Sequence, residues 1–387
     1  MDFDVAVVGM GAMGSAILYQ LSKLGVRCVG IDRHNPPHAF GSSHGDTRIT
    51  RQAVGEGDNY VPFVKASHEI WRELERETGQ SLLIECGALV LAAAGGKAPH
   101  HGKGNFVERT RLAAERFGIP HEMLDAGSIN ARFPHMVGLR GDEIGYFEPG
   151  GGYVRPEGCI SAHLTMARKN GAAIKTKTVV RSVTRSSGAA VIETDTGSIT
   201  AEKVVVAAGA WTPGLLGEKF PRILSISRQV LYWFEMEESA AASPDWPVAI
   251  WMHGAGEEDY FYSFPPQEGE HTVKVATEHY AENTDVDSIR RDVTDGESAA
   301  MFETHVKGRL AGVSPRVART ATCLYSTTPD RGFVLDDLQD ASGTFVVSAC
   351  SGHGFKHSAG IGLAVAGAIA GRSADFDLSP FSIARFG

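Results

Sequence analysis

The chain lacks the features that mark several classes of protein. Its 387 residues include five cysteines, an odd number, and none of them stands in a CxxC pair or at the spacing of metal ligands. Neither a disulfide framework nor a zinc site is therefore expected. No apolar run approaches the roughly 18 residues that a membrane-spanning helix needs. We predict a protein without a metal and without a membrane partner.

An excess of positive charge is also missing. The net charge is −9, and the charged residues are spread rather than blocked, which disfavours a nucleic-acid partner. The first residues, MDFDVAVVGMG, enter a strand pattern without a basic leader segment, so we expect a cytoplasmic protein. A content of 43% apolar and 21% charged residues is typical of a globular chain with two lobes around large cores.

The N-terminal segment predicts a nucleotide-binding βαβ unit. Residues 4–9 form a β-branched run, "MGAMGSAILYQLSKLG" follows with helical spacing, and "VRCVGID" is a second strand. Gly9, Gly11 and Gly14 stand in G-x-G-x-x-G register, and Asp32 ends the second strand. Such glycines let the backbone and a helix N-terminus approach a pyrophosphate, and the acid can bind a ribose hydroxyl. A merely glycine-rich turn is the alternative interpretation.

The middle of the chain predicts a second, sheet-rich lobe. Helices are expected over 66–78 and 104–118, and the loop between them carries His100 and His101, which we expect in solvent rather than on a metal. From about residue 177 the pattern predicts successive strands, and residues 229–278 contain the aromatic-rich strand candidates "QVLYWFEM", "YFYSF" and "HTVKVAT". This order fits an antiparallel sheet inserted between nucleotide-binding segments.

The C-terminal region repeats the strand–turn–helix device. A strand over 345–350, the glycine turn "CSGHGFK" and a small-residue helix over about 358–371 are expected. The segment could bind the other end of a cofactor, or its small residues could serve packing alone. Because a flavin dinucleotide would use two such sites and a nicotinamide cofactor generally one, a flavin explains both.

The stretch "GSSHGDTRITRQAVGEG" places two arginines among glycines. A small carboxylate substrate held over a flavin ring needs a fixed bidentate donor, which arginine supplies and lysine does not. Arg48 and Arg51 would share a face only in a helix and would diverge in an extended segment. Structural ion pairs with Asp46 or Glu56 are the alternative for either arginine.

The sequence resembles the monomeric sarcosine oxidase and N-methyltryptophan oxidase family, flavoenzymes that oxidise secondary amino acids. The matching blocks are "VVGMGAMGSA", "PPHAFGSSHGDTRITRQAVGEGDNYVP", "VVVAAGAWTPGLL", "CLYSTTPDRGFVLD", "SGHGFK" and the closing "DFDLSPFSIARF". The resemblance implies an α/β fold (α+β overall) with a discontinuous Rossmann-like FAD-binding domain and an inserted antiparallel-sheet substrate domain. The expected division is 1–85, 150–220 and 320–387 for FAD, and 86–149 and 221–319 for the substrate.

The resemblance also implies roles for individual residues. It implies FAD as cofactor, attached through a thioether to Cys323, with a small amino acid and oxygen as substrates and peroxide as product, in a monomer. The catalytic group comprises Lys274, which activates oxygen, with Arg48, His44 and Tyr262. Substrate contacts come from Arg51 and Lys356, which bind the carboxylate, and from Tyr325. The expected cofactor-binding residues are Gly9, Gly11, Met13, Gly14, Asp32, Ser42, Arg48, Gly209, Cys323, Gly352, His353, Gly354, Phe355 and Lys356.

Physical arguments refine some of these roles. Positive charge from Arg48 would favour the thiolate of Cys323. Strand alternation places Lys274 opposite Val273 and Val275, on a face that either meets water or covers the flavin. A cluster of Arg48, Arg51, Lys274 and Lys356 would disfavour a protonated amine and free its lone pair. His353 either contacts the flavin or braces the backbone.

The chain departs from the family pattern at several positions. Ser43 precedes His44 where a histidine is common, Gln52-Ala53-Val54 replaces "HAY", and a family histidine falls on Glu278, with His279 next to it. A bulkier or cyclic secondary amino acid is therefore as good a candidate as sarcosine. A flavin dehydrogenase with another electron acceptor, a flavin subunit of a larger complex and a non-flavin NAD-binding protein remain alternatives.

Overall fold

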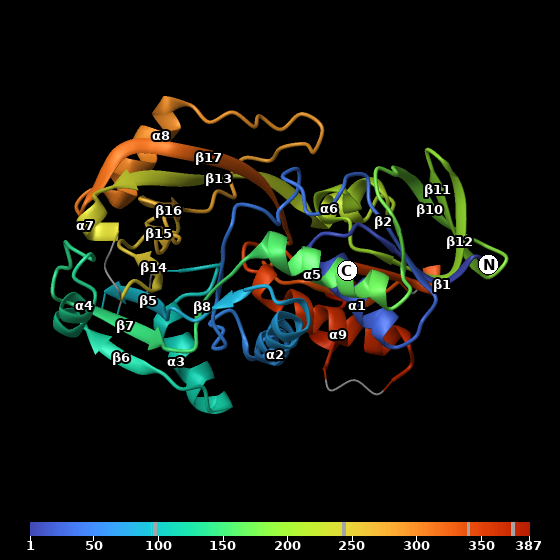
Figure 1. The fold of residues 1–387 in the computed structure, drawn as a ribbon, viewed down its shortest axis with the longest axis horizontal. Coiled ribbons are helices and arrows are strands. Elements are labelled where there is room, and N and C mark those ends of the chain that lie inside the picture. The colour runs from blue at the N-terminus through green and yellow to red at the C-terminus, as the bar shows by residue number, and fades with distance from the viewer. Residues whose placement is uncertain (94, 96–98, 242–244, 339–340, 373–375) are drawn as a thin grey trace.

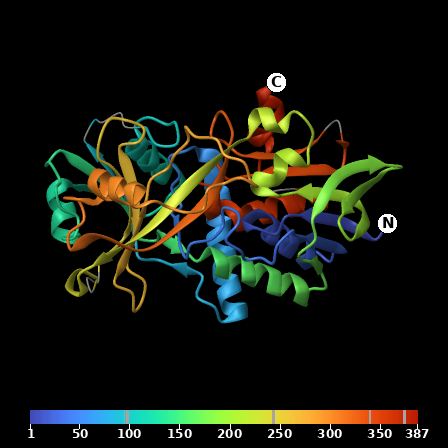
Figure 2. The ribbon, with the colours of Figure 1, turned by 90° about the horizontal axis from the view of Figure 1, so that it is seen from above.

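The fold is built on two large sheets at opposite ends of an elongated molecule (Figure 1). A computed structural model describes residues 1–93, 95, 99–241, 245–338, 341–372 and 376–387. Residues 94 and 96–98 of the loop expected before His100 lie outside the described residues. In the view from above, the long strand β13 (Ser225–Met236) extends between the two ends (Figure 2).

The first sheet has the parallel centre of a nucleotide-binding fold. Strand β1 (Phe3–Val8) lies between β2 (Cys28–Ile31) and β12 (Gly197–Val206), parallel to both. The other members are β9 (Ala173–Lys175), β10 (Val180–Ser186), β11 (Ala189–Thr194), β18 (Val334–Asp337) and β19 (Thr344–Ser348). Because β19 pairs in parallel with the C-terminal half of β12, the last part of the chain returns to the centre of this sheet.

Helices cover one face of this sheet (Figure 1). They are α1 (Ala12–Lys23), α2 (Val61–Thr78), α5 (Pro156–Lys169) and α9 (Ser358–Ile369). Close approach between α1 and α9 requires glycine, since a Cβ on Gly362 would lie 2.7 Å from the backbone of Ala16. The small residues of α9 thus do serve packing, as one of the two sequence interpretations held.

The second sheet is mostly antiparallel and has the order β17-β13-β16-β15-β14-β5-β7-β6. Its core combines aromatic and branched side chains such as Phe234, Trp251, Phe261 and Val275. Its other strands are β5 (Ala88–Ala93), β6 (Glu122–Asp125), β7 (Glu143–Glu148), β14 (Val248–Met252), β15 (Tyr260–Phe264), β16 (Thr272–Ala276) and β17 (Val313–Thr327). Around it lie α3 (Phe106–Phe117), α4 (Ala126–Arg132), α7 (Glu238–Ala241) and α8 (Asp295–Met301).

A small third sheet carries the arginine-rich segment. It consists of β3 (Arg48–Thr50), β8 (Gly152–Val154) and β4 (Leu83–Ile84), while α6 (Phe220–Ile223) lies apart from it, just before β13. The stretch is extended at Arg48 rather than helical, and Arg51 follows the last residue of β3.

The secondary structure predicted for most segments is confirmed. The helices expected over 66–78 and 104–118 are α2 and α3, although α2 begins earlier, at Val61, with a proline in its first turn. The strands expected after residue 177 and over 229–278 are present. The division into two domains remains a proposal, and β17 crosses its expected boundary at residue 320. None of the described helices is long and apolar enough to cross a membrane.

Candidate active site

A cavity of about 670 Å³ begins at the carboxyl ends of β1 and β2. This is where open α/β sheets bind their ligands, and the volume lies within the ~300–1,000 Å³ of small-molecule and cofactor sites. The cavity reaches from the βαβ turn to the turn before α9, so both predicted nucleotide sites open into it. Among the expected cofactor residues, its lining includes Gly9, Gly11, Met13, Asp32, Ser42, Arg48, Gly209, Gly352, Gly354 and Phe355.

The glycines of the first turn are required by close backbone contacts. Gly9 has φ +88°, and a Cβ there would lie 2.6 Å from the carbonyl oxygen of Ala207. A Cβ on Gly14 would collide with the carbonyl oxygen of Gly9, so Gly14 shapes the turn without lining the cavity. Gly11 has open space on its cavity side, where the nearest protein atom to an added Cβ would be Ser43 Oγ at 4.0 Å. The turn thus offers bare backbone to a ligand.

Asp32 braces the same turn. Its Oδ2 accepts a hydrogen bond from the backbone N–H of Met10 at 2.8 Å, and its Oδ1 accepts one from the backbone N–H of His34 at 2.8 Å. The carboxylate still faces the cavity. An adenine dinucleotide bound here would find backbone N–H donors of the glycine turn for its pyrophosphate and a carboxylate acceptor for a ribose hydroxyl. These are the groups that bind such a cofactor in this fold.

A second cavity of about 70 Å³ adjoins the first. The two share Arg48, Tyr325, Gly352 and Phe355 in their linings, so a group at this end of the large cavity lies next to the small one. The small cavity is lined further by Ile49, Arg51, Glu56, His100, His101, Ile250, Tyr262, Phe264, Glu278, His353 and Lys356. Three predicted substrate-binding residues, Arg51, Lys356 and Tyr325, are thereby brought together.

Arg51 and Lys356 both contact the carboxylate of Glu56. Arg51 Nη2 lies 3.4 Å from Oε2, and Lys356 Nζ lies 3.3 Å from Oε1. Burial alone would raise the pKa of Glu56, but Lys356 and Arg51 outweigh it and hold the pKa well below its usual range. The pairing of Arg51 with Glu56, one of the alternatives from sequence, is therefore present. Arg51 Nε has no hydrogen-bond partner within the described part of the chain.

Arg48 instead binds backbone carbonyls. It donates to Thr47 O at 2.8 Å and to Ser42 O at 2.7 Å, which orients its guanidinium toward both cavities. Asp46 does not take Arg48 as a partner, because it pairs with Arg319. An ion pair between Arg48 and Asp46, one of the alternatives from sequence, is thus not formed.

Lys274 is buried, and its side chain faces the arginine-rich loop. Its Nζ donates to Gly45 O at 2.6 Å, Thr47 O at 2.8 Å and Thr47 Oγ1 at 3.0 Å. Val273 and Val275 point into the opposite core, so the expected alternation holds and the water-facing alternative is wrong. Burial lowers the pKa of Lys274 well below its usual range, and Arg48 adds to the effect. Three acceptors nevertheless match the three N–H bonds of an ammonium group.

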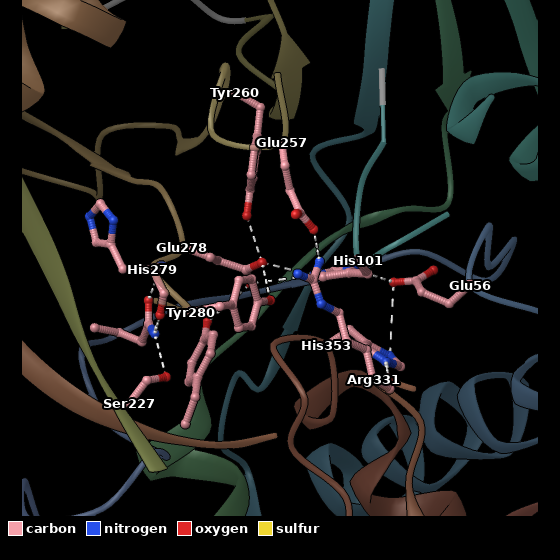
Figure 3. Close-up of polar contacts among 12 residues, drawn as sticks. Glu56, His101, Ser227, Glu257, Tyr260, Glu278, His279, Tyr280, Arg331 and His353 are labelled. Carbon is pink, nitrogen blue, oxygen red and sulfur yellow. Dashed lines mark hydrogen bonds and ion pairs between the residues drawn. The ribbon is translucent and has the colours of Figure 1, made fainter. Parts of the chain in front are cut away.

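Glu278 lies at the centre of a ring of hydroxyl donors (Figure 3). Tyr260 and Tyr280 each donate to Oε2 at 2.6 Å, and Tyr325 donates to Oε1 at 3.3 Å. The neighbouring His279 is exposed. Of the two residues at the departure from the family pattern, Glu278 is therefore the one that enters the cavity.

His100 and His101 are buried, so the expectation of a solvated loop is wrong. The turn closes on itself through backbone hydrogen bonds between His100 and Lys103 at 3.0 and 2.9 Å. His100 packs edge-on against Phe106 and Tyr260, and both imidazoles line the small cavity. Sequence reasoning missed them because an Ala- and Gly-rich segment precedes them and no local pattern predicts burial. No group of three potential metal ligands occurs in the described residues.

Cys323 lies buried in β17, behind the lining of the two cavities. Burial raises the pKa of its thiol to about 11, although Arg48 and Lys274 act in the opposite direction. Arg48 therefore lowers the pKa of the thiol, as expected, but burial raises it by more. A different thiol, Cys350, lines the large cavity directly.

Three further expected residues have distinct positions. Tyr262 lines the small cavity. His353 lines it too, and its Nε2 is 3.0 Å from the carbonyl oxygen of Arg331, which agrees with the backbone-bracing interpretation. His44 is buried beside the arginine-rich loop but lines neither cavity. Burial, with Arg48 and Lys274, lowers the pKa of His44 to about 4, so its ring is neutral at neutral pH.

Comparison with known proteins decides the family. The sequence profile described as "FAD dependent oxidoreductase" matches residues 4–368. The chain belongs to this family. It is 34% identical to a monomeric sarcosine oxidase from Bacillus sp. (strain NS-129), covering 99% of this chain and 97% of the relative. It is 30% identical to an N-methyl-L-tryptophan oxidase from Salmonella heidelberg (strain SL476), covering 100% of both chains.

Solved structures agree on the fold. NikD, an unusual amino acid oxidase essential for nikkomycin biosynthesis, matches with a TM-score of 0.82 at 23% identity, covering 98% of this chain and 97% of that one. Glycine oxidase from Geobacillus kaustophilus matches with a TM-score of 0.77 at 21% identity, covering 98% of both chains. The expected fold class and the expected enzyme class, an FAD-dependent amine oxidase, are confirmed at the level of the family. FAD is accordingly the cofactor of this family, and the large cavity has room for it.

Proposed function

We propose that this protein oxidises secondary amino acids, N-methylated or cyclic, at the C–N bond. The observation that carries the proposal is the pair Arg51 and Lys356, whose cations converge on one carboxylate in a small cavity next to the FAD-sized one. A substrate carboxylate that replaced that of Glu56 would find both cations already in position. Arginine's fork then fixes the direction of the substrate, and lysine adds charge.

FAD, when bound, would supply the redox chemistry: it would take a hydride, that is two electrons and one proton, from the substrate carbon, and these with a second proton would reduce oxygen to hydrogen peroxide. Water then hydrolyses the imine product. The residues proposed to hold FAD are those that line the large cavity at the two glycine turns and along Ser42, Arg48 and Gly209. We also propose a covalent bond between FAD and Cys323, a role that rests on the resemblance. Since the thiol has a pKa of about 11, its thiolate is scarce until a bound group adds positive character nearby.

Lys274 is the proposed site of oxygen activation. Its buried Nζ has only backbone and hydroxyl oxygens as partners among the described residues. These acceptors favour the ammonium form, which burial and Arg48 disfavour, and no carboxylate among those partners neutralises its charge. A cation about 4 Å from developing superoxide would stabilise it by roughly 4 kcal/mol at an effective dielectric near 20.

The small cavity is lined by carboxylates as well as by the cations of the expected cluster. Glu56 and Glu278 line it together with Arg48, Arg51 and Lys356. The substrate carboxylate adds a further negative charge. The net positive charge around the amine is then smaller than that of four cations alone, so it disfavours a protonated amine less strongly. We propose that the amine binds as the free base, because burial beside Arg48 disfavours its charged form, and that its proton passes to solvent on binding without a dedicated base.

The wall of the cavity bears on the choice of substrate. Val54, at the position where the family has an aromatic residue, is buried in an apolar cluster with Ala53 and Phe106 and lines neither cavity. Ile250, Tyr262 and Phe264 supply an apolar wall, which suits a cyclic or branched substrate. We further propose that the protein acts as a monomer, as the name of the sarcosine oxidase relatives states for those enzymes.

Peroxide formation by matched compounds tests the function. An N-methyl amino acid or proline should give peroxide, whereas the corresponding N-methyl amine without a carboxylate should react at least a hundredfold more slowly, because it cannot use Arg51 and Lys356. The rate with the primary amino acid that has the same side chain, compared with the rate of its N-methyl form, measures the preference for a secondary amine. Equal rates with and without the carboxylate would contradict the proposal.

A further inference from the structure

One imidazole joins two carboxylates across the small cavity (Figure 3). His101 Nδ1 lies 3.0 Å from Glu56 Oε1, and His101 Nε2 lies 3.0 Å from Glu278 Oε2. All three side chains are buried. Glu56 comes from the loop after β3, His101 from the loop before α3, and Glu278 follows β16, so the contact ties three separate segments together.

Glu56 has two competing sets of partners. On one side stand Arg51 and Lys356, the proposed carboxylate site, and on the other stands His101. A substrate carboxylate can bind the two cations only if Glu56 yields them. A buried carboxylate left without partners costs several kcal/mol of stability. A further partner that stays bound to Glu56 reduces this cost when Arg51 and Lys356 turn to the substrate.

A cationic His101 can serve as that partner. A ring between two carboxylates donates from both nitrogens only when it is protonated. Burial opposes its charge, but Glu278 and Glu56 outweigh burial and raise the pKa of His101. The other groups that face the ring do not supply a negative charge: His100 stacks on it with ring centroids 3.9 Å apart, and His353 lies 5.0 Å away.

Glu278 keeps the imidazolium in place. Its three tyrosine donors hold the carboxylate anionic, since burial alone would raise the pKa of Glu278 but His101 and its hydrogen bonds lower it below the usual range. The Glu278 carboxylate is therefore stabilised without a contact to Arg51 or Lys356. Its position is consistent with an anchor for His101.

We propose that His101 is a positioning residue that holds Glu56 and so releases Arg51 and Lys356 to the carboxylate of the substrate, with Glu278 as its anchor. The inference rests on the proposed function, because it assumes that the two cations bind a carboxylate. It adds a residue from the sheet-rich lobe that acts through Glu56 and does not touch the reacting atoms.

The test measures binding rather than turnover. Propionate carries a carboxylate but no amine to oxidise, so its Kd can be read from the change in flavin absorbance of the holoenzyme. His101→Asn should raise the Kd about tenfold at pH 6.5, the loss expected for one charge-assisted contact. His135→Asn is the matched control, because His135 is buried to the same extent as His101 but stacks on Trp246 and lines neither cavity. It should leave the Kd within about twofold.

A double variant distinguishes positioning from a structural role. Glu56→Gln removes the competitor, so His101→Asn on that background should change the Kd less than about twofold. Glu278→Gln alone should act like His101→Asn, since it removes the anchor, and it offers an independent measurement should Glu56→Gln fold poorly. Equal Kd values for His101→Asn and wild type, or undiminished loss on the Glu56→Gln background, would overturn the inference. Propionate binding without any amine oxidation would instead count against the proposed function alone.

Discussion

Arg51 and Lys356 contact opposite oxygens of one buried carboxylate, at 3.4 and 3.3 Å from Glu56. They come from distant parts of the chain, the loop after β3 and the turn before α9. The turn before α9 also lines the FAD-sized cavity, through Gly352, Gly354 and Phe355. The anion site therefore lies beside the proposed cofactor site.

Replacement of Arg51 by lysine should weaken substrate binding. Lys keeps the charge but loses the planar fork and its two parallel donors. We expect the KM of an N-methyl amino acid to rise at least tenfold and kcat to change less, in steady-state peroxide assays. Arg109→Lys is a suitable control, since Arg109 donates to the same loop at Gly55 O but lines neither cavity. A larger fall in kcat than rise in KM would contradict the binding role.

Carboxylate binding should weaken as the pH rises through about 8. Burial lowers the pKa of Lys356 to about 8, against the opposing effect of Glu56. The ammonium is thus charged below that pH and neutral above it, so affinity is present on the acid side and lost on the alkaline side. The inhibition constant of propionate against pH measures this. Lys356→Arg should remove the alkaline limb because arginine stays charged, and an unchanged limb would assign it to another group.

Lys274→Met should separate the two halves of the reaction. Methionine fills similar space without a charge, so reduction of the flavin by substrate should change less than about fivefold. Reoxidation by oxygen should slow at least a hundredfold, which corresponds to about 2.7 kcal/mol. Stopped-flow absorbance measures both rates. Equal slowing of the two would show that Lys274 shapes the site without activating oxygen.

Two cysteines are candidates for the proposed covalent bond to FAD. Cys323 is the residue that the family resemblance assigns, whereas Cys350 is the one that lines the large cavity. After acid precipitation, we expect yellow colour in the pellet for wild type and Cys350→Ser, and in the supernatant for Cys323→Ser. Colour that stays in the Cys323→Ser pellet would transfer the role to another residue.

Much of the fold could be predicted because its signals are local. The glycine spacing, the acid at Asp32 and the alternation around Lys274 each follow from neighbouring residues, and each is present in the structure. For Arg48 and Arg51, the sequence left open whether the stretch is helical or extended, and so whether the two side chains share a face. The structure settles that choice through pairing of β3 with β8.

The acidic side of the site could be predicted only in part. Glu278 stood out as a departure from the family pattern and Glu56 as a possible partner of the arginines, but Glu278 and His101 meet only because β16 and the loop before α3 come together in the fold. Local pattern suggested solvent for His101, so its contacts with both carboxylates could not be expected. The effect of Arg48 on the Cys323 thiol was expected, but burial outweighs it because the fold packs Cys323 away from both cavities.

The most direct test of the central claim is an anaerobic titration of the yellow protein with an N-methyl amino acid or proline, followed by admission of oxygen. An FAD-dependent oxidase of secondary amino acids should lose its flavin absorbance with one equivalent of substrate and regain it in air, with one equivalent of peroxide. Absorbance that persists with every secondary amino acid tried would contradict the account. Bleaching without recovery in air would contradict the role of oxygen as acceptor.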